Sequence, residues 1–190
     1  MEEELFSNKK FTNIDYSGRD LSGKEYDNCI FKNCIFSKCR LTDTDFTDCR
    51  FEECDFSLVR FGNTGLRDII FSGCKLVGTE FTGCKDSFLG FTFENCLVDY
   101  SSFQNMKISR TIFRDCSFKE SDFTDTDLSG ASFINCDLAR SVFVRTNLEK
   151  ADLRSSVNYS INPETNKIKQ AKFSWPGVAG LLDKYNICIE

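Results

Sequence analysis

The chain has 190 residues, a net charge of −5, 41% hydrophobic residues and no histidine. The missing histidine excludes Ser-His-Asp and Cys-His nucleophile systems and every metal site that needs an imidazole. The mildly acidic balance argues against binding nucleic acid or an anionic membrane by charge alone, and no apolar run approaches the roughly 18 residues of a membrane span.

A period of five residues organises the chain from its N-terminal region onward. Large apolar residues begin weakly at Phe6 and recur at strict intervals of five from Phe11 to Phe81. Neither an α-helix, with its period of 3.6, nor a strand, with its period of 2, produces this spacing. Repetition at a fixed short interval is typical of a solenoid. The sequence therefore predicts one elongated domain over residues 1–175.

A smaller residue, mostly Cys or Thr, stands two positions before most of these apolar centres. Allowing for one slip, six cysteines lie a single 20-residue period apart: Cys34, Cys54, Cys74, Cys96, Cys116 and Cys136. Four blocks of five would then make one coil, with residues 20 apart stacked at about 4.8 Å. About eight coils are expected.

The pattern breaks in two places before the tail. Near residues 85–87 the centres slip by two residues and resume at Phe88, which we interpret as a small surface bulge or loop. Over 156–170 the pattern falters at a segment rich in turn formers, among them Asn158 and Pro163. We expect an irregular coil there, followed by a return to the old register.

Residues 176–190 are predicted to form a separate C-terminal segment. Pro176 suits the start of an α-helix, and the apolar residues after it have the spacing of an amphipathic one. Ile187 and Ile189 alternate like a short strand. The segment could cap its own last coil, or it could dimerise through Trp175, Val178, Leu181, Leu182, Tyr185, Ile187 and Ile189.

The eleven cysteines allow a structural and a chemical interpretation. Ten of them occupy the small inward position, and only Cys188 does not. Their spacing is that of the repeat and not the close C-x2-C of a zinc site, while parallel stacking would hold their Cβ atoms too far apart for a disulfide ladder. We expect reduced, structural thiols, no metal and no cofactor. Because the N-terminus also lacks the apolar region of a signal peptide, we expect a cytoplasmic location.

The blocks TDFTD at 44–48, CDFSL at 54–58, SDFTD at 121–125 and ADLRS at 151–155 resemble the pentapeptide-repeat proteins. The resemblance covers about residues 6–175 and implies a right-handed quadrilateral parallel β-helix with the Phe or Leu and the small residue pointing inward. The tail, NYSINPETNKIKQAKFSWPG followed by GLLDKYNICIE, is similar to that of the Qnr-type quinolone-resistance and microcin-immunity branch.

This second resemblance implies a head-to-head homodimer through the C-terminal helix. It also implies a DNA mimic, in which an acidic surface imitates duplex DNA to DNA gyrase and topoisomerase IV and protects them from quinolone-like or microcin-like inhibitors. Residues 1–137 hold 24 acidic against 16 basic residues, and residues 138–190 hold 5 against 8. The candidate partner-binding residues form two groups: Asp43, Asp45, Asp48, Glu52, Glu53 and Asp55, then Asp115, Glu120, Asp122, Asp125 and Asp127.

Three alternatives remain open at this stage. The acidic groups could simply keep a rod soluble, and the protein would then be a scaffold for an unrelated partner. An ice-binding solenoid would need outward Thr-x-Thr ranks, but the regular threonines fall in inward positions. A glycosidase-like solenoid would need a pocket around paired carboxylates, and no insertion is available to build one. We expect no catalytic residues, no direct binding of nucleic acid and no membrane.

Overall fold

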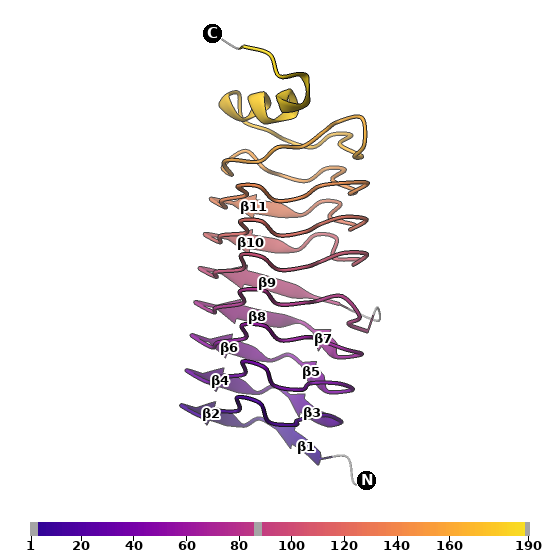
Figure 1. Cartoon of the computed structure of the whole chain (residues 1–190). Coiled ribbons are helices and arrows are strands. Elements are labelled where there is room, and N and C mark those ends of the chain that lie inside the picture. The colour runs from indigo at the N-terminus through magenta and orange to yellow at the C-terminus, as the bar shows by residue number, and fades with distance from the viewer. Residues whose placement is uncertain (1–3, 86–88, 189–190) are drawn as a thin grey trace.

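The computed structural model describes residues 4–85 and 89–188, and it is a parallel β-solenoid. The chain climbs as a rod from the N-terminus at one end to the C-terminus at the other (Figure 1). One parallel sheet contains, in order, β1 (Glu4–Ser7), β3 (Lys24–Asp27), β5 (Asp45–Thr47) and β7 (Gly65–Arg67). A second contains β2 (Lys10–Thr12), β4 (Ile30–Lys32), β6 (Arg50–Glu52), β8 (Ile69–Ser72), β9 (Phe91–Glu94), β10 (Ile112–Arg114) and β11 (Ser132–Ile134).

Four columns of parallel pairing give each coil four faces. Face A holds the four-stranded sheet and continues as single bridges from Lys107 to Lys167. Face B holds the seven-stranded sheet and continues to Lys172. Faces C and D consist of isolated bridges only, from Asp15 to Val157 and from Asp20 to Val142 respectively. The predicted quadrilateral coil is therefore confirmed, with five residues to a face.

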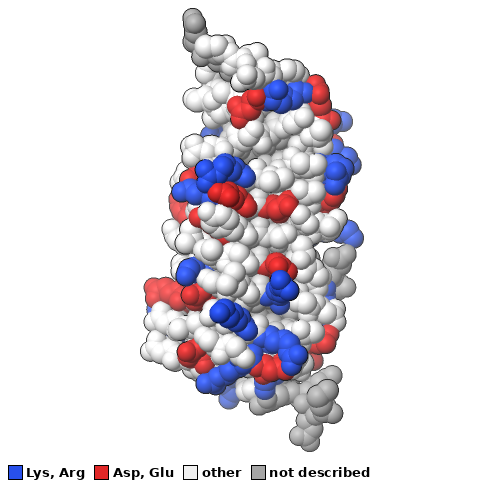
Figure 2. Space-filling view, in the orientation of Figure 1, with Lys and Arg blue, Asp and Glu red and all other residues white. Residues whose placement is uncertain are grey.

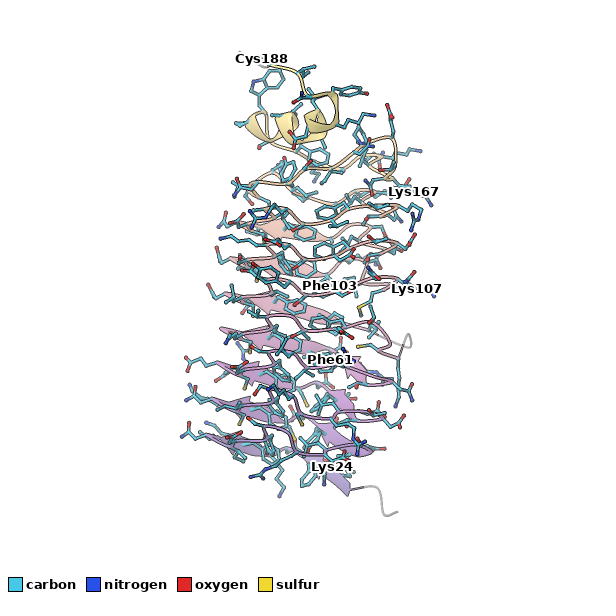
Figure 3. The ribbon with its side chains drawn as sticks, in the orientation of Figure 1. Lys24, Phe61, Phe103, Lys107, Lys167 and Cys188 are labelled. Atoms are coloured by element: carbon cyan, nitrogen blue, oxygen red, sulfur yellow. The ribbon has the colours of Figure 1, made fainter. Side chains whose placement is uncertain are left out.

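The apolar centres fill the rod as stacked columns. On face B, rings 20 residues apart stack with centroids 4.7–5.4 Å apart: Phe11, Phe31, Phe51, Phe71, Phe93, Phe113 and Phe133. Rings from neighbouring faces meet them edge to face, as Phe51 meets Phe56 at 4.9 Å. Figure 3 shows Phe61 and Phe103 inside the rod. Offset stacking and edge-to-face contact are the preferred aromatic geometries, which explains why one ring shape is reused.

The small inward residues also carry a hydrogen-bond donor. The Thr126 hydroxyl donates to the Phe103 carbonyl at 2.7 Å, and the Cys54 thiol lies 3.4 Å from the Phe31 carbonyl. Both bonds reach back 23 residues, to an apolar centre of the previous coil. Burial makes an unbonded polar group costly, so Ser, Thr and Cys suit this position better than size alone requires. All eleven thiols are free, with ten buried and Cys188 exposed, as expected.

The corners between faces require a left-handed backbone. Most corner residues are Asn, Asp or Gly, which adopt positive φ most easily. The remaining corner residues are long charged or polar side chains, except for Leu58 and Tyr100, each at φ 60 on the corner between faces C and D. A bulky residue at positive φ is uncommon and carries a backbone cost, so these two positions need another explanation.

The expected two-residue slip is present on face A and its corner with face B. Ile69 pairs with Phe91, an offset of 22 residues where other coils have 20. The Lys85 N–H still bonds the Thr64 carbonyl, and the Gly90 N–H bonds the Leu66 carbonyl. The extra residues therefore lie between Lys85 and Gly90. The expected centre at Phe88 lies outside the described residues.

The irregular coil over 156–170 is built around Asn166. This residue occupies the small inward position, where its carboxamide oxygen accepts from the Thr146 N–H at 2.8 Å and its NH2 donates to the Phe143 carbonyl at 2.9 Å. A turn over residues 163–165 precedes it. The bridge from Asn147 to Lys167 then restores the 20-residue offset.

The prediction of an α-helix in the C-terminal segment is wrong as to the type of helix. The segment forms two short 3-10 helices, η1 (Pro176–Leu181) and η2 (Asp183–Tyr185). Ile187 belongs to no strand, and Ile189 lies outside the described residues. The segment is fitted tightly against the last coil: a Cβ on Gly180 would lie 2.0 Å from the Tyr159 carbonyl oxygen, and the Ile161 N–H donates to the Gly180 carbonyl at 2.9 Å. The segment therefore caps the rod, which was one of the two expected roles.

Candidate protein-binding surface

The first acidic group is distributed around the rod. Asp45 lies on face A in β5, Glu52 on face B in β6, and Asp55 on face C. Asp43, Asp48 and Glu53 occupy corners at positive φ. Residues adjacent in sequence turn a corner every five residues, so this group spans three faces of one coil and does not form one acidic surface.

Basic side chains neutralise much of the first group. The Lys85 ammonium lies 2.7 Å from both carboxylate oxygens of Asp45. Glu52 is paired with Arg50 at 3.0 Å, and Lys75 lies 3.7 Å from Asp55. Exposed pairs of this kind contribute little to stability, but they cancel the local negative potential.

The second acidic group is partly brought together. Glu120, Asp122 and Asp125 lie on face D and its two corners, whereas Asp127 is on face A and Asp115 is on the corner between faces B and C. The Arg145 guanidinium donates to both Asp125 oxygens at 2.7 and 2.6 Å and holds the pKa of that carboxyl below its usual range. Arg140 pairs with Glu120 in the same way across one coil, donating from Nε and Nη2 to a single carboxylate oxygen. This part of the surface is therefore also of mixed charge.

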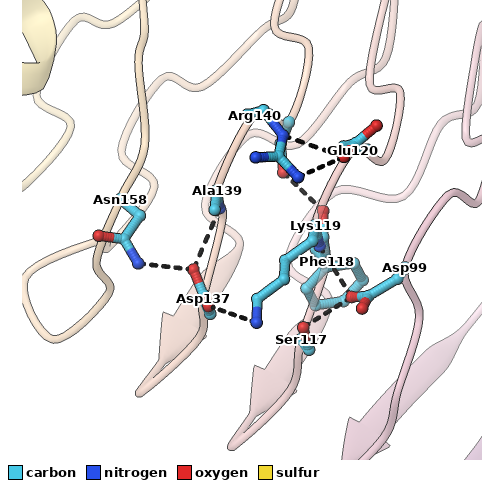
Figure 4. A network of polar contacts seen from close by, with 10 residues as sticks. Asp99, Ser117, Phe118, Lys119, Glu120, Asp137, Ala139, Arg140 and Asn158 are labelled. Atoms are coloured by element: carbon cyan, nitrogen blue, oxygen red, sulfur yellow. Dashed lines mark hydrogen bonds and ion pairs between the residues drawn. The ribbon is translucent and has the colours of Figure 1, made fainter.

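A cross-coil polar network extends the mixed charge onto face C (Figure 4). The Asp137 carboxylate accepts from Asn158 at 2.8 Å and pairs with the Lys119 ammonium at 3.2 Å. Asp99 accepts from the Ser117 hydroxyl at 2.6 Å and from the Lys119 N–H at 2.9 Å. Asp99 is held by groups of the following coil, and Asp137 is held by Lys119 of the preceding coil and Asn158 of the following one, so both carboxylates have fixed positions.

Figure 2 shows charges of both signs interspersed on the displayed face, with a weakly charged area at mid-height. Exposed apolar residues lie on the corner between faces C and D and beside it. Leu58 and Tyr100 are each 59% exposed, Gly78 stands between them on the same corner, and Leu97 on face C is 40% exposed. We name Leu58, Gly78, Leu97 and Tyr100 the mid-rod ridge.

Sequence reasoning missed this ridge, although a signal was present. Leucine and tyrosine stand at corner positions whose other occupants are glycine or charged residues, and both side chains are mostly exposed. Backbone strain and exposed apolar area at the same place are typical of contact sites.

The expected dimer residues divide into two sets. Trp175 is 89% exposed, and Tyr185 and Ile187 are also exposed. Val178, Leu181 and Leu182 are half-buried, and Leu181 packs on the core. The cap therefore packs one apolar side against its own coil. A second apolar surface, formed by Trp175, Tyr185 and Ile187, stays exposed.

The surface of the described residues has shallow, open grooves. One groove of about 570 Å³ runs between the cap and the coil that contains Tyr159. Within residues 4–85 and 89–188 there is no cluster of three cysteine or carboxylate ligands for a metal ion. No helix in the same ranges has the length and apolar character needed to cross a bilayer.

Comparisons with known proteins agree with this geometry. The families described as pentapeptide repeat region and pentapeptide repeats (8 copies) match residues 44–117 and 27–57, and the SV2A/B/C luminal domain family matches residues 83–158. No curated protein matches the sequence. Two structures of QnrB1, a plasmid-mediated fluoroquinolone resistance protein, are similar at 17% identity.

The similarity to QnrB1 extends over the whole rod. Both structures are of trypsin-treated single-substitution variants of that protein. One gives a TM-score of 0.64, with 99% of this chain and 98% of that chain covered. The other gives 0.63, with 99% of each chain covered. At this identity the likeness establishes the fold and its extent, from the first coil to the cap.

Proposed function

We propose that this chain, which is a pentapeptide-repeat protein, is a non-enzymatic cytoplasmic binding protein that contacts a type II topoisomerase and protects it from quinolone-like or microcin-like inhibitors. The observation that carries the proposal is the match in extent with QnrB1, which covers 99% of this chain and 98% of that chain. A rod of similar extent, closed by a cap at its C-terminal coil, is suited to lie along an extended protein surface.

DNA mimicry is the finer part of the expectation, and the charges limit it. A mimic of duplex DNA needs a continuous line of negative charge. Faces C and D instead carry acids paired with Lys75, Lys119, Arg140 and Arg145. In the proposal the mid-rod ridge therefore supplies the contact energy, because exposed aromatic and aliphatic side chains dominate protein interfaces, and the paired carboxylates align the partner.

The same proposal includes a head-to-head homodimer through the cap. Trp175, Tyr185 and Ile187 expose apolar surface at the end of the rod, where an uncovered solenoid edge favours association. Trp175→Ser with Ile187→Ser should convert a dimer into a monomer in light scattering. Leu5→Ser, at a residue that is 60% exposed near the other end, is the matched control. A monomeric parent chain would refute this part alone.

A gyrase supercoiling assay with and without ciprofloxacin tests the partner. Titration of the protein should restore supercoiling in the presence of the drug. Leu58→Asn with Tyr100→Asn should remove this protection without loss of stability, because Asn accepts the left-handed corner. Leu5→Asn should protect like the parent. Absence of both protection and inhibition at micromolar concentration would refute the topoisomerase proposal.

A scaffold for an unrelated protein partner is the second candidate, and the mixed charge favours it. It predicts that the variant with Leu58→Asn and Tyr100→Asn no longer binds that partner. It also predicts that neither the parent chain nor this variant changes gyrase supercoiling or quinolone susceptibility. The same pair of variants therefore separates the two functions.

A further inference from the structure

A basic surface lies on the C-terminal half of faces A and B and on the corner between them. Six exposed basic residues of this region form no ion pair among the described residues: Arg110, Arg114, Lys150, Lys167, Lys169 and Lys172. Lys107 belongs to the same column as Lys167, and Figure 3 shows both pointing away from the same side of the rod. In a chain of net charge −5, this concentration of positive charge is unexpected.

Few carboxylates oppose this charge. Asp152 forms an ion pair with Arg154 at 2.7 Å, and Asp127 accepts a hydrogen bond from the Asn147 side chain at 3.0 Å. Glu149 is a third carboxylate of the region, and Glu94 is the Cα partner of Arg114 on the preceding coil of face B. The acids of the C-terminal half gather instead on faces C and D, so this half of the rod is basic on one side and of mixed, more acidic charge on the other.

Small residues form the floor between the basic groups. Ser129, Gly130 and Ser132 occupy one coil, with Arg110 and Arg114 on the coil before it and Lys150 on the coil after it. A Cβ on Gly130 would lie 3.5 Å from the Arg110 side chain, so that side chain extends over the floor toward Lys150. Serine hydroxyls and cationic side chains together are the groups that bind phosphate oxygens in protein–DNA interfaces.

We propose that this basic surface binds the phosphate backbone of duplex DNA. Arg110 and Lys169 are three coils apart, about 14 Å at about 4.8 Å per coil, which corresponds to about four phosphates of one strand at about 3.4 Å each. A rigid rod presents these charges as a straight array, which suits a linear polyanion. Among the described residues of this surface, Ile112 is the exposed large apolar residue, at 39% on face B beside Ser132, and a single aliphatic side chain is too little to anchor a lipid interface. Binding is independent of sequence, because no element enters a groove.

Fluorescence anisotropy of a short labelled DNA duplex with the full chain tests this inference. Log affinity should fall linearly with log salt between about 50 and 200 mM, by about 0.9 per phosphate neutralised. The triple variant Lys150→Glu, Lys167→Glu and Lys169→Glu should reduce the slope by about 2.7 and weaken binding at least about tenfold at low salt. The matched control is Lys9→Glu, Lys10→Glu and Lys38→Glu, which makes the same charge change at exposed residues elsewhere.

The control should stay within about threefold of the parent, and circular dichroism should show both triples folded. Equal weakening by the two triples would reduce the effect to net charge and overturn the inference. So would absence of parent binding at low salt, or binding to phosphatidylserine-containing vesicles without binding to DNA. The assay contains no topoisomerase, so it can fail while the proposed function holds, and the reverse.

Discussion

Phe71 provides the sharpest test of the aromatic columns. Its side chain is fully buried, and its ring stacks on Phe51 at 5.3 Å and on Phe93 at 5.1 Å, with Phe56 edge-on at 5.5 Å. Phe→Ala in a core costs about 3–5 kcal/mol, and each aromatic pair adds about 0.5–1.5 kcal/mol beyond buried area. With two stacked partners lost, we expect Phe71→Ala to lie in the upper half of that range.

Two further variants separate ring stacking from simple burial. Phe71→Leu removes the ring contacts but keeps an apolar side chain of a type that Leu76 and Leu128 already supply at equivalent positions. It should therefore cost less than Phe71→Ala but at least about 1 kcal/mol, since two stacked pairs at about 0.5–1.5 kcal/mol each are lost. Phe11→Ala, at the half-buried N-terminal end of the same column, should cost clearly less than Phe71→Ala, because a terminal coil has only one neighbour.

Urea unfolding followed by circular dichroism measures these differences, provided that the slope m is unchanged between variants. A loss below about 1 kcal/mol for Phe71→Ala would contradict the packing argument, whose lower bound is about 3 kcal/mol. Equal losses at Phe71 and Phe11 would show that the rod does not transmit stability from coil to coil in the way that stacked columns require.

Three further outcomes are expected. Gly180→Ala should lower the melting temperature, because its Cβ would lie 2.0 Å from a backbone carbonyl oxygen, whereas Gly62→Ala, whose nearest contact is 3.8 Å away, should not. In the native protein at mildly alkaline pH, a disulfide reagent should titrate one thiol, that of Cys188, and in denaturant all eleven; more than one native thiol would contradict the buried slots. Because Arg145 lowers the pKa of Asp125, the pair stabilises the fold above the unfolded carboxyl pKa of about 3.9, and this contribution is lost as pH falls toward the lower folded value. Urea midpoints of Arg145→Met and the parent should therefore differ at neutral pH and converge in acid.

The interior was predictable because one rule repeats. A ring at every fifth position has only one way to be buried, so Phe31 and Phe51 were placed correctly from spacing alone. The donor role of the inward threonines and cysteines was not foreseen, because size explains the choice of residue equally well until the carbonyls 23 residues earlier are located. The slip near residue 85 was foreseen, because the apolar centres before it and those after it each keep a spacing of five residues, while the two series are offset by two.

The surface was harder to predict, because corners separate sequence neighbours. Asp45 and Asp55 are ten residues apart and point from different faces, whereas Arg110 and Lys150 are forty apart and share a corner. The cap was predicted as an α-helix from apolar spacing, but Gly180 is fitted against Tyr159, which the pattern does not encode. Neither the ridge nor the basic surface follows from composition, since both depend on which coil position each residue occupies.

The insertion between Lys85 and Gly90 has a consequence for how the chain finds its fold. Coils with interchangeable interiors could pair one turn too early or too late, and each misplacement would still stack rings. Across the insertion this tolerance ends: an offset of 20 would set Phe71 level with Phe91 and would displace the left-handed corners by two residues, whereas the native offset sets it level with Phe93. The two extra residues therefore restrict the N-terminal and C-terminal halves of the rod to one pairing register, although the coils within each half are interchangeable.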